Sequence, residues 1–139
     1  MSQVLLDTHA WVWLLAGSSR IGPKTRKAIQ HSLDSGSVLV AAISAWEVAM
    51  LVAKGRLVLD RDVGEWIDTA LALPGICLEP LSPEIAVAST RLPGTLHGDP
   101  ADRMITATAR HCGAALVTAD ALLLDYGKAG HLKTIKASQ

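Results

Sequence analysis

The stretch VLLDTHAW, residues 4–11, carries the strongest structural signal in this chain. Three consecutive apolar residues end at Asp7 and Thr8, and both residue types commonly begin a helix. A short apolar run followed directly by a helix start is typical of a strand that is buried in a parallel sheet. The stretch therefore predicts a strand at residues 4–6 and a helix over residues 8–16, ended by Gly17.

The same alternation of apolar runs and helical patterns continues along the chain. Further strands are predicted at residues 38–41, 76–81, 115–118 and, more weakly, 133–136. Further helices are predicted at residues 23–36, 44–54, 62–73, 83–91, 99–111 and 121–126. This order predicts an α/β fold: a single domain over residues 1–139, with three α/β/α layers and a mostly parallel central sheet of four to five strands. Ligands of such folds bind outside the carboxyl ends of the strands.

Composition narrows the classes of protein that fit. Half of the 139 residues are hydrophobic, which excludes disorder of the whole chain. No apolar run approaches the roughly 20 residues of a membrane span, and the start lacks the positive region of a signal peptide, so a cytoplasmic protein without membrane contact is expected. The formal net charge is zero, so any contact with nucleic acid must be local. Cys77 and Cys112 lack zinc-ligand spacing and are expected to be small buried hydrophobes.

Five acidic residues stand where an apolar run gives way to a turn or a helix start. Each has a purely local explanation. Three of them suit helix caps, and Ser44 with Glu47 matches the capping box, in which the two side chains bond reciprocally to the first helical turn. Taken singly, capping is the favoured interpretation for most of them. The five residues are Asp7, Glu47, Asp99, Asp102 and Asp120.

Taken together, these residues favour a different interpretation. Strands at 4–6 and 115–118 place Asp7 and Asp120 at carboxyl ends of the sheet, and Glu47 and Asp102 are expected in the first turns of helices beside it. Two carboxylates about 4 Å apart repel by about 4 kcal/mol at an effective dielectric constant of about 20. Such a cluster must protonate, spread apart or bind a cation. Oxygen ligands without thiols or imidazoles select Mg²⁺ or Mn²⁺.

The segments LLDTHAWVWLL, ISAWEVAMLVAKGRL, HGDPADRMITATA and LVTAD, found together in this order, resemble PIN domains. The resemblance covers essentially the whole chain and is close to VapC-type toxins of toxin–antitoxin pairs. It implies a Mg²⁺-dependent (or Mn²⁺-dependent) endoribonuclease that hydrolyses RNA phosphodiester bonds and is held inactive by a cognate antitoxin protein. It further implies a homodimer, and contact with DNA only indirectly, through the antitoxin.

The resemblance also assigns roles. Asp7, Glu47, Asp102 and Asp120 match the four acidic positions of the family in order, as catalytic residues and metal ligands. Asp99 is additional, and is either a supporting metal ligand or only a helix cap. The resemblance places the metal on Asp7 and Asp102, with Glu47 or Asp120 orienting the attacking water.

Two alternatives stay open from the sequence. His9 and His97 lie close in sequence to acidic residues, and a metal-free ribonuclease can use imidazoles as acid and base. The chain can also be a non-catalytic, PIN-like protein-binding or regulatory module whose acidic residues only cap helices.

Two further sets of side chains are expected to contact partners. Cations that can contact RNA phosphates are Arg20, Lys24, Arg26, Lys27, Lys54, Arg56 and Arg103. Trp11 and Trp13 cannot both face one side of a helix, so one of them, or Trp66, is expected on a partner surface, whereas Trp46 is expected within the apolar stripe of its helix.

Overall fold

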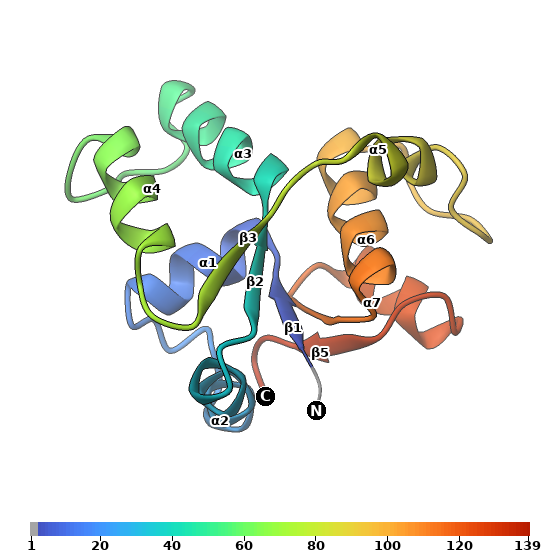
Figure 1. The fold of residues 1–139 in the computed structure, drawn as a ribbon, viewed down its shortest axis with the longest axis horizontal. Coiled ribbons are helices and arrows are strands. Elements are labelled where there is room, and N and C mark those ends of the chain that lie inside the picture. Colours follow the sequence, from blue (N-terminus) through green and yellow to red (C-terminus); the bar gives the residue numbers. More distant parts are fainter. Residues whose placement is uncertain (1–2) are drawn as a thin grey trace.

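A five-stranded sheet lies between two layers of helices (Figure 1). The computed structural model describes residues 3–139, so the first two residues of the domain predicted over 1–139 lie outside it. The strands are β1 (Val4–Leu6), β2 (Val38–Ala41), β3 (Ile76–Glu79), β4 (Ala115–Thr118) and β5 (Thr134–Lys136). The helices are α1 (Thr8–Leu15), α2 (Pro23–Asp34), α3 (Ala42–Ala53), α4 (Val63–Leu71), α5 (Pro83–Ser89), α6 (Pro100–Cys112) and α7 (Ala121–Lys128).

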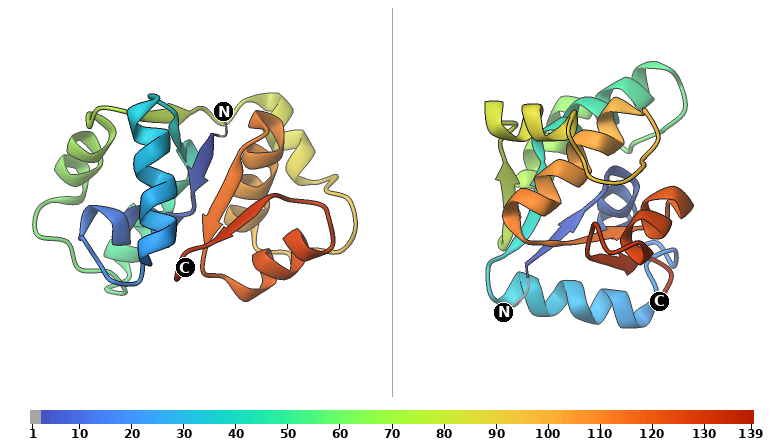
Figure 2. Two further views of the ribbon diagram at one scale, coloured as in Figure 1. Left: turned by 90° about the horizontal axis from the view of Figure 1, so that it is seen from below. Right: turned by 90° about the vertical axis from the view of Figure 1, so that its right-hand side faces the viewer.

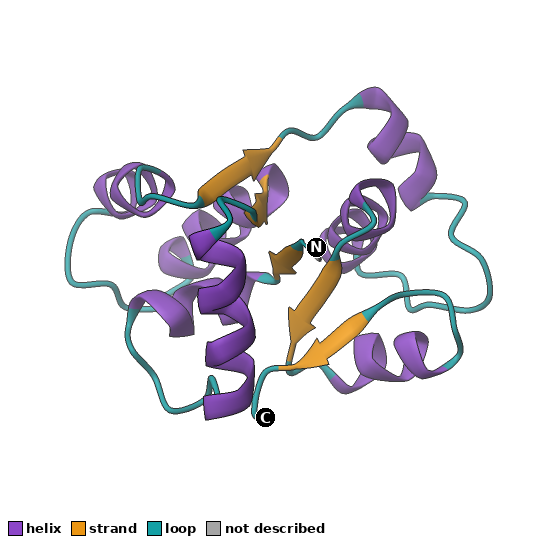
Figure 3. Ribbon diagram, turned by 60° about the horizontal axis from the view of Figure 1, so that its bottom comes forward, coloured by secondary structure: helices purple, strands orange, loops and turns teal. Residues whose placement is uncertain are grey.

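The strand order β3-β2-β1-β4-β5 places the start of the chain at the centre of the sheet. All neighbouring strands are parallel, and Figure 3 shows them as one layer between the helices. From β1 the chain adds strands outward to β3, then returns to the other side of β1 to add β4 and β5. The direction therefore reverses between β1 and β4, and ligands of open α/β sheets bind at such a switch point. The predicted three-layer fold is confirmed, with a sheet that is entirely parallel.

Alternation along the strands divides the core between the two faces of the sheet. Val4 and Leu6 pack with residues of α1, α2 and α4, whereas Leu5 packs with residues of α6 and α7. Figure 2 shows these two groups of helices on opposite sides of the sheet. On the first face, Trp11 is fully buried and meets the edge of Trp66, with ring centroids 4.9 Å apart. Both faces of β1 are thus covered, which explains its uninterrupted apolar run.

Several predicted boundaries differ by a few residues from those of the structure, and two of the differences have identifiable reasons. Helix α3 begins at Ala42 and not at Ser44, because β2 runs into it without a loop and Ser44 lies buried inside the first turn. Strand β3 ends at Glu79, not at residue 81, because Pro80 has no amide hydrogen to extend the ladder. The first of these differences changes the environment of Glu47.

Some expectations for side chains are also corrected. Cys77 is exposed, because β3 is an edge strand, while Cys112 is partly buried. Trp46 was expected within the apolar stripe of its helix but is 56% exposed on α3. Trp11 and Trp66 are buried, so neither of them lies on a surface open to a partner. Within residues 3–139, no helix has both the length and the apolar character needed to span a membrane.

Candidate active site

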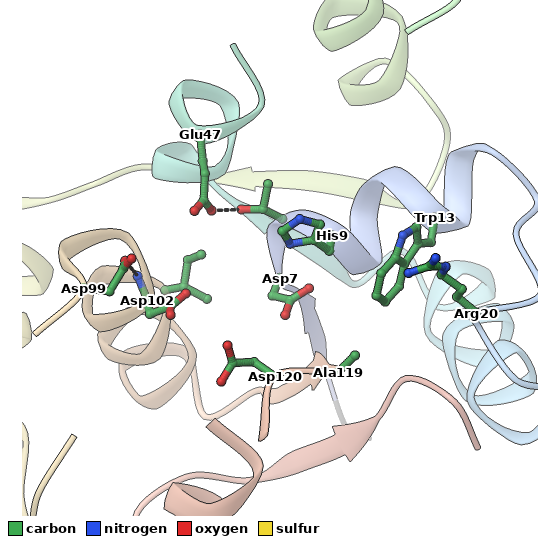
Figure 4. A pocket seen from close by; sticks show the side chains of 11 residues that line it. Asp7, His9, Trp13, Arg20, Glu47, Asp99, Asp102, Ala119 and Asp120 are labelled. Carbon is green, nitrogen blue, oxygen red and sulfur yellow. Dashed lines mark hydrogen bonds between the residues drawn. The ribbon is translucent and has the colours of Figure 1, made fainter. Parts of the chain in front are cut away.

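All five acidic residues singled out in the sequence line one open cavity of about 460 Å³ (Figure 4). They arrive there from four distant segments: the end of β1, the middle of α3, the start of α6 and the turn after β4. The cavity lies at the switch point between β1 and β4. The residues that line it are Asp7, Thr8, His9, Trp13, Arg20, Glu47, Asp99, Asp102, Ile105, Ala119 and Asp120.

Asp7 is the deepest of these carboxylates and is only 8% exposed. Its Oδ1 accepts a hydrogen bond from the Ala10 amide at 2.8 Å and so caps α1, while its Oδ2 accepts one from the Thr118 hydroxyl at 2.5 Å. Burial outweighs these stabilising bonds and raises the pKa of Asp7 to about 6. The capping role predicted for Asp7 and its place in the cavity therefore hold together.

Glu47 does not form the predicted capping box, because α3 begins two residues before Ser44 and Glu47 falls in the second turn. Its carboxylate instead accepts a hydrogen bond from the Thr8 hydroxyl, which also lies 3.1 Å from the Ser44 hydroxyl. Partial burial raises the pKa of Glu47, and the negative charges of Asp102 and Asp99 raise it further. A contact across 39 residues of sequence thus replaces the local one.

Asp102 lies in the first turn of α6, as predicted, and its Oδ2 is 2.8 Å from Nε2 of His97. Burial raises the pKa of Asp102, and the charges of Asp99 and Asp120 add to this, although the His97 hydrogen bond opposes it. His97 had no signal in the sequence as a partner of Asp102. Its spacing of five residues crosses from the loop at 92–98 into the helix, so helical periodicity does not reveal it.

Arg103 holds the loop that carries His97. Its guanidinium donates to the carbonyl oxygens of Ser89 and Leu96, each at 2.9 Å. These bonds hold the Arg103 guanidinium against the loop, a structural role that the sequence analysis did not predict. Because the loop positions His97, Arg103 indirectly supports the orientation of Asp102.

Asp99 and Asp120 are both helix caps at the rim of the cavity. Asp99 is exposed, and its Oδ1 accepts from the Asp102 amide at 3.0 Å. Asp120 is half-buried, and its Oδ1 accepts from the amides of Leu122 and Leu123 at 2.9 and 3.1 Å. In each case the described capping bonds use one carboxylate oxygen, so capping leaves the second oxygen available to a ligand.

The carboxylates are spread around the cavity and are not packed against one another. Within the part of the chain that the structure describes, no three acidic, histidine or cysteine side chains converge tightly enough to hold a metal ion directly. The donors are nonetheless all oxygens. The charge of Asp102 interacts with that of each of the other four carboxylates, Asp7, Glu47, Asp99 and Asp120. This donor set suits Mg²⁺, which retains several of its own waters when it binds to proteins.

Six non-acidic residues also line the cavity, and three of them lie near one another. His9 and Trp13 lie on α1, with ring centroids 5.9 Å apart, and the Arg20 guanidinium lies 5.3 Å from the centroid of Trp13. The sequence indicated Arg20 and His9 separately, as a cation and a possible acid–base group, but it did not place either beside Trp13. Both histidines of the alternative mechanism are thus at or beside the cavity, since His97 contacts Asp102.

Comparison with known proteins shows which family the chain belongs to. The family model described as PIN domain matches residues 4–129 of the chain. Ribonuclease VapC22 of Mycobacterium tuberculosis (strain ATCC 25618 / H37Rv) is 36% identical over 120 residues, which cover 86% of this chain and 88% of that protein.

Solved structures share the fold at lower sequence identity. VapBC2 from Rickettsia felis, bound to a DNA fragment from its promoter, gives a TM-score of 0.68 at 16% identity and covers 95% of this chain and 96% of its own. A toxin–antitoxin complex from Klebsiella pneumoniae gives 0.63 at 20% identity, with coverage of 97% and 98%. From the matched residues, the VapC relative and the shared fold, we conclude that this chain belongs to the PIN domain family.

Proposed function

We propose that residues 1–139 form a single PIN domain that acts as a metal-dependent endoribonuclease, the toxin of a toxin–antitoxin pair. The observation that carries this proposal is the arrangement of Asp7, Glu47, Asp102 and Asp120 around one cavity at the switch point of the sheet. The 36% identical relative is named as a ribonuclease, which supports hydrolysis of RNA phosphodiester bonds as the reaction.

In this proposal Asp7 and Asp102 hold Mg²⁺ (or Mn²⁺), Asp120 and Glu47 complete the negative site, and Asp99 supports it from the rim. When bound, an ion of this kind would polarise the scissile phosphate and activate a water for attack. Glu47 or Asp120 would orient the attacking water and accept its proton. The Thr118 hydroxyl holds Asp7 in place, and the Thr8 hydroxyl does the same for Glu47.

The electrostatics of the cavity support cation binding. Burial raises the pKa of Asp7 to about 6 and also raises the pKa of Glu47 and Asp102. A raised pKa means that the ionised carboxylates are poorly compensated by their surroundings. A divalent cation supplies that missing compensation, so binding it is coupled to loss of protons from these groups.

We further propose that a cognate antitoxin protein inhibits the domain, that the toxin is a homodimer, and that contact with DNA is made only through the antitoxin. The structural relatives support the antitoxin, because they are toxin–antitoxin complexes and one is bound to promoter DNA. Since the substrate is RNA, the proposed activity is cytoplasmic.

Cleavage of purified RNA tests the enzymatic proposal. Mg²⁺ is expected to support cleavage, EDTA to abolish it, and Asp102→Asn to abolish it in the presence of Mg²⁺. Asp125→Asn is the matched control, because Asp125 is an exposed acid of α7 that does not line this cavity. Cleavage that survives EDTA would instead support acid–base chemistry by His9 and His97. Sequencing of RNA ends after expression, compared with the Asp102→Asn form, identifies the substrate.

The non-catalytic module remains a second candidate, favoured by the capping bonds of Asp7, Asp99 and Asp120 and by the spread of the carboxylates. The two proposals differ in their response to metal. A metal-binding nuclease gains thermal stability with Mg²⁺ or Mn²⁺, because the ion binds the folded state. A module whose acidic residues are only caps shows no such increase.

A further inference from the structure

The cavity has two chemically different ends (Figure 4). Glu47, Asp99, Asp102 and Asp120 surround one end, whereas Trp13 and Arg20 lie together at the other, beyond His9. The second end is therefore aromatic and cationic. The proposed hydrolysis uses only the acidic end, which leaves the other end without an assigned role.

Arg20 is the one arginine or lysine that lines this cavity in the described chain, and its side chain is exposed. Within residues 3–139 its guanidinium makes no hydrogen bond or ion pair, and it lies beside the Trp13 ring. Two other arginines differ from it: Arg26 donates to the Ser18 carbonyl and Arg103 to the loop carbonyls. The guanidinium of Arg20 therefore has its donors available for a ligand, and the ligand must be anionic or polar.

Trp13 contributes a broad ring surface at the same place. Trp11, two residues earlier, is fully buried against Trp66, whereas Trp13 is only partly buried and borders the cavity. A partly exposed indole beside a cation is the combination by which single-stranded nucleic acids are bound, since bases stack on aromatic rings while cations contact the backbone. A peptide ligand accounts less well for the pair, because five of the eleven residues that line the cavity are acidic and two, Ile105 and Ala119, are aliphatic, so the lining offers few apolar partners to a peptide.

We propose that Trp13 and Arg20 form a nucleotide subsite, in which a base of single-stranded RNA stacks on the Trp13 indole and Arg20 binds a neighbouring phosphate. This inference rests on the proposed function, because it places the scissile phosphate at the acidic end of the same cavity. Stacking requires a base that is free of its own helix, so the subsite selects single-stranded over duplex RNA. It confers little preference among the four bases, because every base has a ring face.

The test separates the base from the backbone. One probe is a labelled single-stranded RNA of about 8 nucleotides, within the usual site size for such grooves, and the other is the same strand without its bases. Binding is measured by fluorescence anisotropy in an Asp102→Asn background with Mg²⁺, which keeps the probes intact. Trp13→Leu is expected to weaken binding of the complete strand by about 5- to 150-fold and to leave the abasic strand nearly unaffected.

Trp46→Leu is the matched control, because it makes the same change at an exposed indole that does not line the cavity. It is expected to leave both probes unaffected. The stacking proposal is overturned if the Trp13→Leu form binds both probes with the affinity of its parent, or if its affinity for both falls equally. It is also overturned if the parent binds the complete strand no better than the abasic one. Cleavage by the wild-type chain is measured separately, so loss of the proposed function and loss of the subsite are distinguished.

Trp13 also packs partly against the core, so folding of its variants needs an independent check. Trp13→Phe retains a ring, and it is expected to keep part of the preference for the complete strand. RNA is expected to quench tryptophan emission of the Trp46→Phe form and not that of the Trp13→Phe form. Equal quenching of the two forms contradicts the proposal without relying on the leucine variant.

Arg20 is tested through the salt dependence of binding. Arg20→Gln removes one phosphate contact, so the slope of log affinity against log salt concentration is expected to become shallower by about 0.7. Arg91→Gln is the matched control, because Arg91 is an exposed arginine outside the cavity, and it is expected to leave the slope unchanged. An unchanged slope in Arg20→Gln removes Arg20 from the subsite.

Discussion

Asp7 and Asp99 perform the same local task in two regions of the cavity, but only one of them lies deep within it. Each begins a helix and accepts a hydrogen bond from the amide three residues later, Asp7 from Ala10 at 2.8 Å and Asp99 from Asp102 at 3.0 Å. Asp7 follows the central strand and is 8% exposed, whereas Asp99 follows a surface loop and is exposed. Helix capping and a place in the site are therefore not alternatives; depth at the sheet edge distinguishes the two residues.

The largest expected difference is in RNA cleavage. Asp7→Asn is expected to lower the rate by more than about 100-fold, beyond what is typical for outer partners of a metal, whereas Asp99→Asn is expected to lower it by less than about 10-fold. Both substitutions keep an oxygen that can cap the helix, so neither should unfold it. Rates are compared at saturating Mg²⁺, and equal losses in the two variants would place Asp99 in the site on the same footing as Asp7.

Asp7→Asn and Asp99→Asn are also expected to differ in their effect on the free energy of unfolding when no metal is present. Because the pKa of Asp7 is raised from 3.8 to about 6 on folding, the folded protein retains this proton at pH values where the unfolded chain has lost it. The free energy of unfolding therefore falls as pH rises from about 4 to about 6. Above that window, ionised Asp7 costs the fold about 2–4 kcal/mol.

Asp7→Asn should recover this stability at pH 7.5 in EDTA and lose most of the advantage near pH 4, as measured by chemical denaturation at both pH values. Asp99→Asn serves as the reference for the same substitution at an exposed cap. An Asp7→Asn form that is less stable than wild type at pH 7.5 would show that the Thr118 hydrogen bond outweighs burial.

The smallest expected effect isolates capping. Asp99→Ala removes the acceptor of the Asp102 amide and is expected to cost about 1 kcal/mol of unfolding free energy, whereas Asp99→Asn should stay within a few tenths. Thermal denaturation of both variants measures this. If Asp99→Ala also reduces cleavage far more than Asp99→Asn does, the start of α6 positions Asp102 through the cap.

Most of the fold follows from local patterns in the sequence. The apolar runs at β1, β2 and β4 are short, uninterrupted and followed by helix starts, which is what burial on both faces of a parallel sheet requires. The predicted end of β3 is wrong because Pro80 stops the strand at Glu79. The predicted start of α3 is wrong because no loop separates β2 from α3.

The site was less accessible to sequence reasoning, because several of its contacts join distant residues. The pattern of Ser44 and Glu47 matched a capping box, yet Thr8 took the place of the helix amide as the partner of Glu47. Likewise, nothing at Arg103 distinguished a cation that holds a loop from one that meets RNA. The sequence shows the types of the side chains, whereas their partners depend on which elements the fold brings together.

Three helices, α1, α6 and α7, start at Asp7, Asp99 and Asp120, so their amino-terminal ends all face the cavity. Each such end carries about half a unit of positive charge, roughly +1.5 together, which partly offsets the five carboxylates. An amide in place of Asp120 would keep the helix end and remove the negative charge beside it. A form of the protein altered in this way carries one negative charge fewer at the cavity and has impaired chemistry, which makes it suitable bait for recovering the bound transcript from cells.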